Sequence, residues 1–365
     1  MSDQNLTGNK GEWSEIYVFF KLLADGKLYA ADSDLNKLAD IFYPIIKIIR
    51  DEISGKWEYF RNSSIRIVKA NTQELVKEIP MENFKKNSEL LLNEINQASS
   101  RAFSIPKIQS FMKSINCQSL KANPQEKRDI TIMVHDLRTG FKPTLGFSIK
   151  SQLGGASTLL NASKSTNFIY QVQELQINQK EIKKINLIRS RSKIRQRINK
   201  IQELGGRFKF IKTENDIFEL NLKLIDSRLP EIISEVLLSY FKGKGTKIKD
   251  LIEIILEDNP CHFNLDYTHP FYEYKIKNLL TDIALGMTPS NMWNGLYDAT
   301  GGIIIVRGDG EILCYHIYNR NEFQEYLIQN TKLETPSSSR HEYGKLYFED
   351  DLLYFKLNLQ IRFIR

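Results

Sequence analysis

The stretch "LGFSIKSQLG" (residues 145–154) places Lys150 in the middle of an apolar, strand-like run. Side chains alternate between the two faces of a strand, so Ser148, Lys150 and Gln152 share one face and the apolar residues share the other. Burying an ammonium group is costly unless another group pairs with it. Lys150 therefore lies either in water at a sheet edge or in a polar site.

Composition describes a globular protein with a weak preference for an acidic partner. The 365 residues are 41% hydrophobic and 26% charged, which is enough for a sizeable core and argues against wholesale disorder. The net charge of +7 favours a polyanion such as nucleic acid, although many basic proteins bind none. Three widely spaced cysteines, and the absence of a signal peptide or a membrane-length apolar run, predict a cytoplasmic protein without membrane contact.

Periodicity predicts an α/β protein. Apolar spacing, glycines and prolines place expected helices and strands along the chain. The expected helices are 11–25, 72–80, 81–99, 105–116, parts of 175–204, 226–243, 248–258 and 321–330. The expected strands are 28–32, 43–52, 57–70, 129–136 and 145–152, with further hairpins in 301–319 and 345–365.

The hairpin of 129–136 and 145–152 carries the first candidate site. Its outer ends meet, so Asp129 should lie near Lys150. A carboxylate can hold a hard cation, and a lysine can offset phosphate charge and position an attacking water. The alternative is an ordinary Asp–Lys surface pair, which spacing alone favours.

Acidic residues at the start of the first helix add to this site. Glu12 is explained by the helix dipole, whereas Glu15 lies one turn further in, where that explanation is weaker. Glu15 is therefore a candidate second carboxylate.

These motifs together resemble a known family. A G-x-x-x-E helix start, an aspartate at the head of a hairpin and a strand ending in x-x-K are similar to the PD-(D/E)xK nuclease superfamily. The runs "GEWSEIYVFFKLL" (11–23), "GFSIKSQLGGASTLLNASKSTNFIY" (146–170), "TPSSSRHEYG" (335–344) and "LNLQIRF" (357–363) resemble the HpaII family of type II restriction endonucleases more closely. The resemblance covers nearly the whole chain.

The resemblance implies roles for the site residues. Asp129 would bind the metal, and Lys150 would be the catalytic lysine. Ser148 occupies the position of the usual second acid and is a poor metal ligand, so Glu15 is the first candidate to replace it. Asp136 is a weaker candidate and more plausibly a turn residue. Gln152 would orient water or phosphate, or lie at the rim.

DNA contacts are expected from two polar segments and one loop. Asn161, Ser163, Lys164 and Asn167 follow the catalytic strand and can bond phosphates or bases, or simply cap the next element. Arg189, Arg191 and Lys193 belong to a basic stretch that either contacts phosphates or forms a solvated face. Arg340, in a serine-rich loop, is a candidate for guanine recognition.

We therefore expect a mixed central β-sheet flanked by helices with a PD-(D/E)xK core. Residues 1–180 would form the catalytic core and 181–365 the DNA-recognition region, packed as one unit.

The resemblance implies Mg²⁺-dependent hydrolysis of double-stranded DNA at CCGG after the first C, giving 5′-phosphate ends. It also implies a cognate cytosine methyltransferase as genetic partner, and a symmetric target suggests a homodimer. The alternatives are a non-catalytic DNA-binding protein with a decayed site and a structure-selective repair nuclease.

Overall fold

Helices and strands are interleaved in the computed structural model, which describes residues 6–121 and 128–364. The helices in these residues are α1 (Lys10–Asp25), α2 (Met81–Gln97), α3 (Pro106–Ser114), α4 (Gln179–Asn186), α5 (Lys193–Glu203), α6 (Asp216–Ile225), α7 (Leu229–Lys242), α8 (Ile248–Asp258), α9 (Phe271–Leu285) and α10 (Arg320–Gln329), with short 3-10 turns at Lys164–Thr166 and Ile317–Asn319. The strands are β1 (Lys27–Ala31), β2 (Lys37–Glu52), β3 (Gly55–Arg61), β4 (Ile65–Lys69), β5 (Glu74–Ile79), β6 (Ile130–Val134), β7 (Thr144–Ser151), β8 (Thr158–Leu160), β9 (Asn167–Gln173), β10 (Arg207–Thr213), β11 (Gly302–Val306), β12 (Ile312–His316), β13 (Thr331–Leu333), β14 (Leu346–Glu349), β15 (Leu352–Asn358) and β16 (Ile361–Phe363).

The largest sheet is mixed, as expected, but it closes on itself. Its order is β1-β12-β11-β7-β6-β2-β3-β4-β5. Strand β1 pairs with β12 in parallel and also with β2 in an antiparallel manner, so six strands form a closed ring from which β3, β4 and β5 extend. The parallel pairing of β7 with β11 places the lysine-bearing strand inside this ring rather than at its edge. The expectation of a central sheet flanked by helices did not include this closure.

The sequence of helix α1 supplies both a cap that begins the helix and an apolar face that packs on the sheet. Asn9 caps the helix by accepting from the backbone N–H groups of Gly11 and Glu12, and the Glu12 side chain accepts from the Asn9 backbone. Gly26 ends the helix at φ 72°, a conformation that glycine adopts freely. Trp13 and the apolar residues of α1 pack with β2, β6 and β7 in one continuous core.

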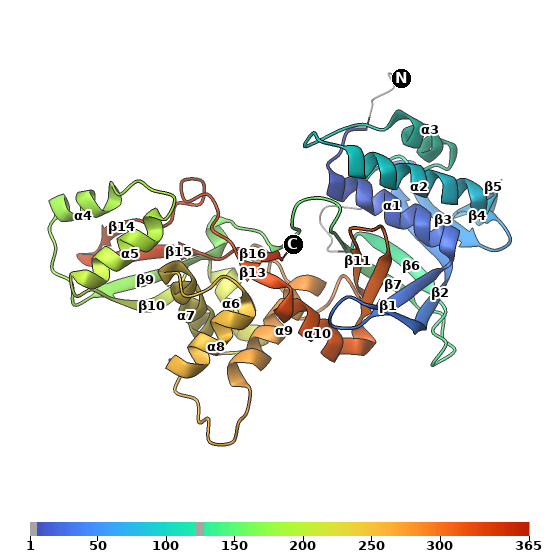
Figure 1. The fold of residues 1–365 in the computed structure, drawn as a ribbon. Helices are drawn as coiled ribbons and strands as arrows, with labels where there is room; N and C mark the ends of the chain where they lie inside the picture. The colour runs from blue at the N-terminus through green and yellow to red at the C-terminus, as the bar shows by residue number, and fades with distance from the viewer. Residues whose placement is uncertain (1–5, 122–127, 365) are drawn as a thin grey trace.

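Two further sheets lie outside the ring, and one of them belongs to a second lobe (Figure 1). The antiparallel sheet β10-β9-β15-β14 is accompanied by α4 to α8, and the small sheet β13-β16-β8 lies between this lobe and the large sheet. Alternate residues of β11 face different cores: Ile304 belongs to the core beneath α1, and Ile303 and Ile305 belong to the core shared with α9 and the second lobe.

Two local predictions were wrong. Residues 72–80 were expected to be helical, but Glu74–Ile79 form β5, an edge strand that pairs with β4 and starts after Gln73 at a positive φ of 54°. Residues 57–70 form two strands, β3 and β4, rather than one. The charged residues of β5 tolerate an exposed edge position. The strand therefore lacks the alternation of buried and exposed residues by which a strand is recognised in a sequence.

The sheets do not follow a boundary at residue 180. Strands β11 and β12 join the sheet of the N-terminal region, whereas β9 joins the sheet of the second lobe. The division into 1–180 and 181–365 stays a prediction. No helix within residues 6–121 and 128–364 has the length and apolar character needed to cross a membrane.

Candidate active site

Asp129 lies where the β6–β7 ladder ends. Its backbone N–H donates to the Phe147 carbonyl at 2.8 Å, which continues the ladder by one residue beyond the Ile130–Phe147 pair. Its carboxylate Oδ2 accepts from the Ile149 N–H at 2.6 Å and from the Ser148 hydroxyl at 3.1 Å. Bonds from both the backbone and a side chain fix the orientation of this carboxylate.

Ser148 links Asp129 to Lys150. The Lys150 ammonium donates to Ser148 Oγ at 2.8 Å, while the same hydroxyl donates to Asp129. Ser148 is buried at 1% exposure, and Lys150 is partly exposed. Lys150 therefore faces a polar site, as one of the two sequence interpretations required, and the hairpin brings it to Asp129 as predicted.

Helix α1 adds Glu15 to the same site. Burial and then the negative charge of Asp129 raise the pKa of Glu15 to about 8, although the positive charges of Arg50, Lys121 and Lys150 act to lower it. The charge of Asp129 thus opposes the ionisation of Glu15 in the same site. The carboxylate of Glu12, in contrast, is used in the helix cap.

These residues line one open pocket of about 680 Å³. Glu15, Asp129 and Lys150 contribute from α1, the start of β6 and β7, and Ile149 and the segment 154–158 complete the wall. Three basic residues that the sequence argument did not assign also line it: Lys10, Arg101 and Arg362. Two of them could have been found from the sequence, because Arg362 lies within a motif run and Lys10 lies next to one. Arg101 lies outside these runs.

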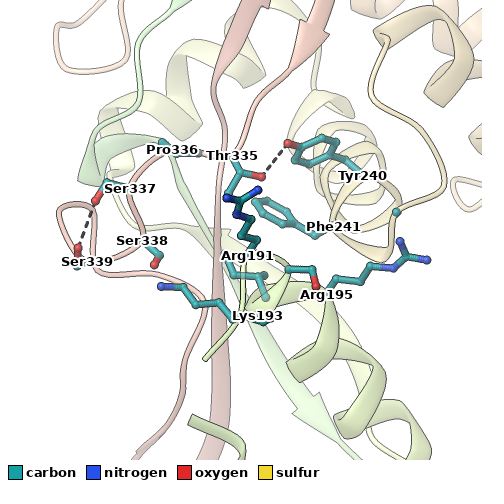
Figure 2. A pocket seen from close by; sticks show the side chains of 14 residues that line it. Arg191, Lys193, Arg195, Tyr240, Phe241, Thr335, Pro336, Ser337, Ser338 and Ser339 are labelled. Atoms are coloured by element: carbon teal, nitrogen blue, oxygen red, sulfur yellow. Dashed lines mark hydrogen bonds between the residues drawn. The ribbon is translucent and has the colours of Figure 1, made fainter. Parts of the chain in front are cut away.

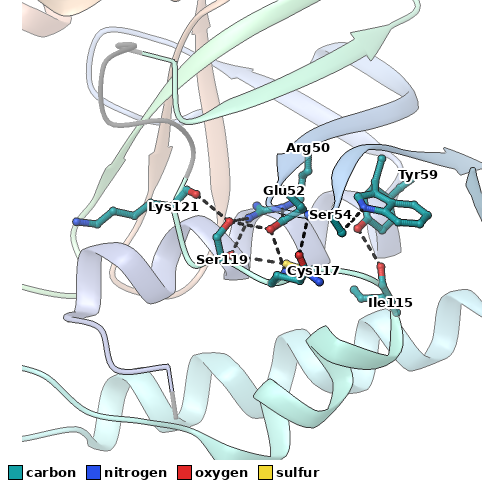
Figure 3. A network of polar contacts seen from close by, with 10 residues as sticks. Arg50, Glu52, Ser54, Tyr59, Ile115, Cys117, Ser119 and Lys121 are labelled. Atoms are coloured by element: carbon teal, nitrogen blue, oxygen red, sulfur yellow. Dashed lines mark hydrogen bonds and ion pairs between the residues drawn. The ribbon is translucent and has the colours of Figure 1, made fainter. Parts of the chain in front are cut away.

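A buried polar network joins the end of β2 to the segment 115–121 (Figure 3). Arg50 donates to Glu52 Oε1 at 2.7 Å and to the Ser119 carbonyl at 2.8 Å. Glu52 Oε2 also accepts from the Ser119 hydroxyl at 2.9 Å. The guanidinium lies 5.1 Å from the centre of the Phe19 ring of α1. Arg50 thus contacts α1 through Phe19. Its positive charge also acts against the increase in the pKa of Glu15 that burial causes.

Two other predicted site residues lie elsewhere. Gln152 is exposed and lines a neighbouring pocket with Lys150, and it is not among the described residues that line the pocket of Glu15 and Asp129. Asp136 is buried and accepts from the Arg138 N–H and the Thr139 hydroxyl, which is the arrangement of a turn residue. Burial raises the pKa of Asp136, but these hydrogen bonds outweigh it and hold that pKa below its ordinary value.

The predicted DNA contacts after the catalytic strand differ in exposure. Asn161 is exposed, Ser163 is half-buried in a capping box with Thr166, and Lys164 forms an exposed ion pair with Glu342 at 2.6 Å. Asn167 is fully buried.

The placement of Asn167 does not support a base contact. Its amide donates to Glu214 at 2.5 Å and to the His341 carbonyl at 2.8 Å, and its oxygen accepts from Asn358 at 2.6 Å. The side chain joins β9 to β15 and to the loop after β10, so its polarity serves the fold.

The basic stretch and the serine-rich loop lie together in the second lobe. Arg191 and Lys193 line a pocket with residues 335–339, whereas Arg189 and Arg340 are exposed nearby in the chain. The sequence placed these segments about 145 residues apart and gave no reason to pair them.

Comparison with known proteins decides the family. The model of the HpaII restriction endonuclease family matches residues 9–363. The chain is also 49% identical over 361 residues to the type II restriction enzyme HpaII of Haemophilus parainfluenzae, covering 98% of this chain and 99% of that protein. The chain belongs to the HpaII restriction endonuclease family. It is a site-specific deoxyribonuclease, and the resemblance inferred from the motif runs is confirmed. No solved structure matches the chain.

Proposed function

We propose that this restriction endonuclease cuts double-stranded DNA at CCGG after the first C and that Asp129, Glu15 and Lys150 carry the hydrolysis. The observation that supports the site is the chain of contacts from Lys150 through Ser148 to Asp129, in a pocket that Glu15 also lines. The name of the HpaII relative supports the CCGG target.

Each side chain has a distinct task in the proposed reaction. Lys150, held by Ser148, orients the attacking water and offsets the negative charge of the phosphate. Lys10, Arg101 and Arg362 hold the flanking phosphates at the pocket wall. Water attacks the phosphorus in line, the bond to the 3′ oxygen breaks, and that oxygen takes a proton, so the products are 5′-phosphate and 3′-hydroxyl ends.

The pocket fits a magnesium ion by its donor chemistry. Two carboxylates supply the oxygen ligands that hard cations prefer. Burial and then the negative charge of Asp129 raise the pKa of Glu15 to about 8, and a divalent cation would favour its ionised form. No group of three His, Cys, Asp or Glu side chains suited to a metal occurs in residues 6–121 and 128–364, so the proposed ion would complete its shell with water and phosphate oxygens. When bound, the ion supplies Lewis acidity at the phosphate.

Partners follow from the proposed activity. A CCGG-specific nuclease would require protection of host DNA by a cognate cytosine methyltransferase. A palindrome also presents two equivalent scissile bonds, which favours a homodimer on the DNA.

The first experiment is digestion of unmethylated phage DNA by the purified protein with Mg²⁺ and, in parallel, with EDTA, followed by sequencing of the ends. Discrete Mg²⁺-dependent fragments ending in 5′-CGG support the proposal. Fragments that share another palindrome contradict the CCGG target. Intact but bound DNA would indicate a decayed site, and cutting confined to branched DNA would indicate a repair nuclease.

A further inference from the structure

The second lobe contains a basic pocket that the catalytic site does not use (Figure 2). It has a volume of about 520 Å³ and is formed by the start of α5, the end of α7 and the serine-rich loop. The described residues that line it include Arg191, Lys193 and the hydroxyl groups of residues 337–339, and none of them is acidic. The catalytic pocket, in contrast, contains Glu15 and Asp129.

The three cations at this pocket are not equivalent. Arg195 turns toward α7, where its guanidinium occupies the space that a Cβ on Gly243 would fill, 2.6 Å away. A cation is favourable at that helix end, so Arg195 has a structural task. Lys193 extends toward Ser338, and Arg191 lies beside Thr335 (Figure 2). Neither Arg191 nor Lys193 forms an ion pair within residues 6–121 and 128–364.

Helix stability does not explain Lys193 either. It opens α5, where the helix dipole disfavours a positive charge, and the first turn of that helix contains no acidic residue. The helix dipole therefore disfavours the charge of Lys193, and a bound anion would offset that unfavourable interaction.

The serine-rich loop, residues 335–339, forms one wall of the pocket and is held by hydrogen bonds. The hydroxyls of Ser337 and Ser339 are 3.2 Å apart, and the Ser338 carbonyl accepts from the Tyr343 N–H. The Tyr343 hydroxyl donates to the Pro336 carbonyl at 2.7 Å, and Thr335 bonds the Tyr240 hydroxyl at 2.8 Å. These contacts fix the shape of the loop, in which Ser338 is the serine nearest to the end of Lys193 in Figure 2.

One short connection joins this pocket to the catalytic pocket. Arg362 lines the catalytic pocket and forms an ion pair with Glu334 at 2.7 Å. The next residue, Thr335, lines the basic pocket, and consecutive Cα atoms are about 3.8 Å apart. One duplex can therefore reach both pockets across the β13–β16 pair, which carries Arg362.

We propose that Arg191, Lys193 and the loop of residues 335–339 bind a backbone phosphate of the same DNA duplex whose scissile phosphate lies in the catalytic pocket. This inference rests on the proposed function. Cations and hydroxyls without an acidic neighbour suit a phosphodiester, which carries one negative charge and accepts several hydrogen bonds. The contact is independent of base sequence and would fix the register of the duplex.

The test compares Arg191→Ala/Lys193→Ala with Lys86→Ala/Lys107→Ala, which removes the same charge from exposed positions on α2 and α3. Binding of a fluorescent CCGG duplex is measured by anisotropy in EDTA from 50 to 200 mM salt. We expect the pocket variant to bind about 10-fold or more weakly, with a salt slope shallower by about 1, since each neutralised phosphate contributes about 0.9. The α2/α3 variant should differ from wild type by less than 3-fold.

A second variant guards against a folding defect. Ser338→Asp, which leaves both cations in place and adds a carboxylate to the wall, should weaken binding at least as much. Equal affinity and slope for the pocket variant and the α2/α3 variant overturn the inference while leaving the proposed function intact. Loss of binding in the pocket variants, when the wild type binds the duplex but does not cut it at CCGG in Mg²⁺, upholds the basic pocket and overturns the proposed target and catalytic site instead.

Discussion

Ser148 occupies the position at which the nuclease motif that the sequence resembles has a second acid, and its contacts link Asp129 to Lys150. Instead of a second carboxylate, the strand presents a hydroxyl that donates to Asp129 and accepts from Lys150. The second carboxyl group comes from α1 as Glu15, which lines the same pocket as Asp129 and Lys150. The site thus keeps two carboxyl groups and one lysine but takes them from three elements.

Replacing Lys150 tests the centre of the proposed site. We expect Lys150→Ala to lower the rate of DNA cutting by about 10²–10³-fold or more, because the variant loses the positive charge that Lys150 places at Ser148 Oγ. Single-turnover cutting of a CCGG duplex measures the rate, and anisotropy in EDTA should show binding within a few-fold of wild type. Cutting within 10-fold of wild type would rule out the assignment of Lys150.

The raised pKa of Glu15 leads to a prediction about how the stability of the protein depends on pH. Because its pKa is raised to about 8, the folded protein retains a proton between pH 4.5 and 8 that the unfolded chain has released. The contribution of Glu15 to the free energy of unfolding is therefore fully present below pH 4.5 and is lost as the pH rises through 8. In EDTA at pH 9, Glu15→Gln should raise Tm by about 2–8 °C relative to wild type, and at pH 5 by much less.

Magnesium supplies the control for that experiment. Adding Mg²⁺ should raise the Tm of wild type at pH 8 and leave the Tm of Glu15→Gln nearly unchanged, since the variant lacks one of the two carboxylates. Equal Mg²⁺-induced shifts in both proteins would exclude Glu15 as a metal ligand without reference to activity.

At the scale of elements, the Arg50–Glu52 pair fixes how α1 meets the end of β2. Both groups are at most 9% exposed, and removing one partner leaves a buried charge without compensation. We expect Glu52→Leu to lower the free energy of unfolding by about 3–5 kcal/mol, measured by urea denaturation. Arg50→Met/Glu52→Leu should recover part of the loss. A single variant within 1 kcal/mol of wild type would show that solvent reaches Arg50.

Elements with strong local signals could be predicted from the sequence, and elements defined by pairing could not. Helix α1 has an Asn cap, an apolar face and a glycine stop, and the β6–β7 hairpin has alternation and a turn. Both were correct, and they are the elements that carry Glu15, Asp129 and Lys150. The strand β5 is exposed along its length, so its pattern carried no burial signal.

Contacts between segments that are distant in the sequence could not be predicted from local patterns. Closure of the ring depends on the pairing of β1 with β12, which are separated by more than 280 residues. Arg362 reaches the catalytic pocket through β16, and Asn167 is buried by partners from three distant segments. Polar residue types alone could not distinguish an asparagine that contacts DNA from one that holds the fold together.

At the scale of the whole molecule, one chain supplies one pocket with Glu15, Asp129 and Lys150, whereas a CCGG duplex offers two symmetric scissile bonds. We expect two protomers of Lys150→Ala to bind one CCGG duplex in EDTA, because a two-fold complex places one pocket at each strand. Light scattering coupled to size exclusion gives the mass, with a duplex lacking CCGG as control. A one-to-one complex, together with accumulation of nicked plasmid during cutting by wild type, would show instead that a single protomer cuts the strands in turn.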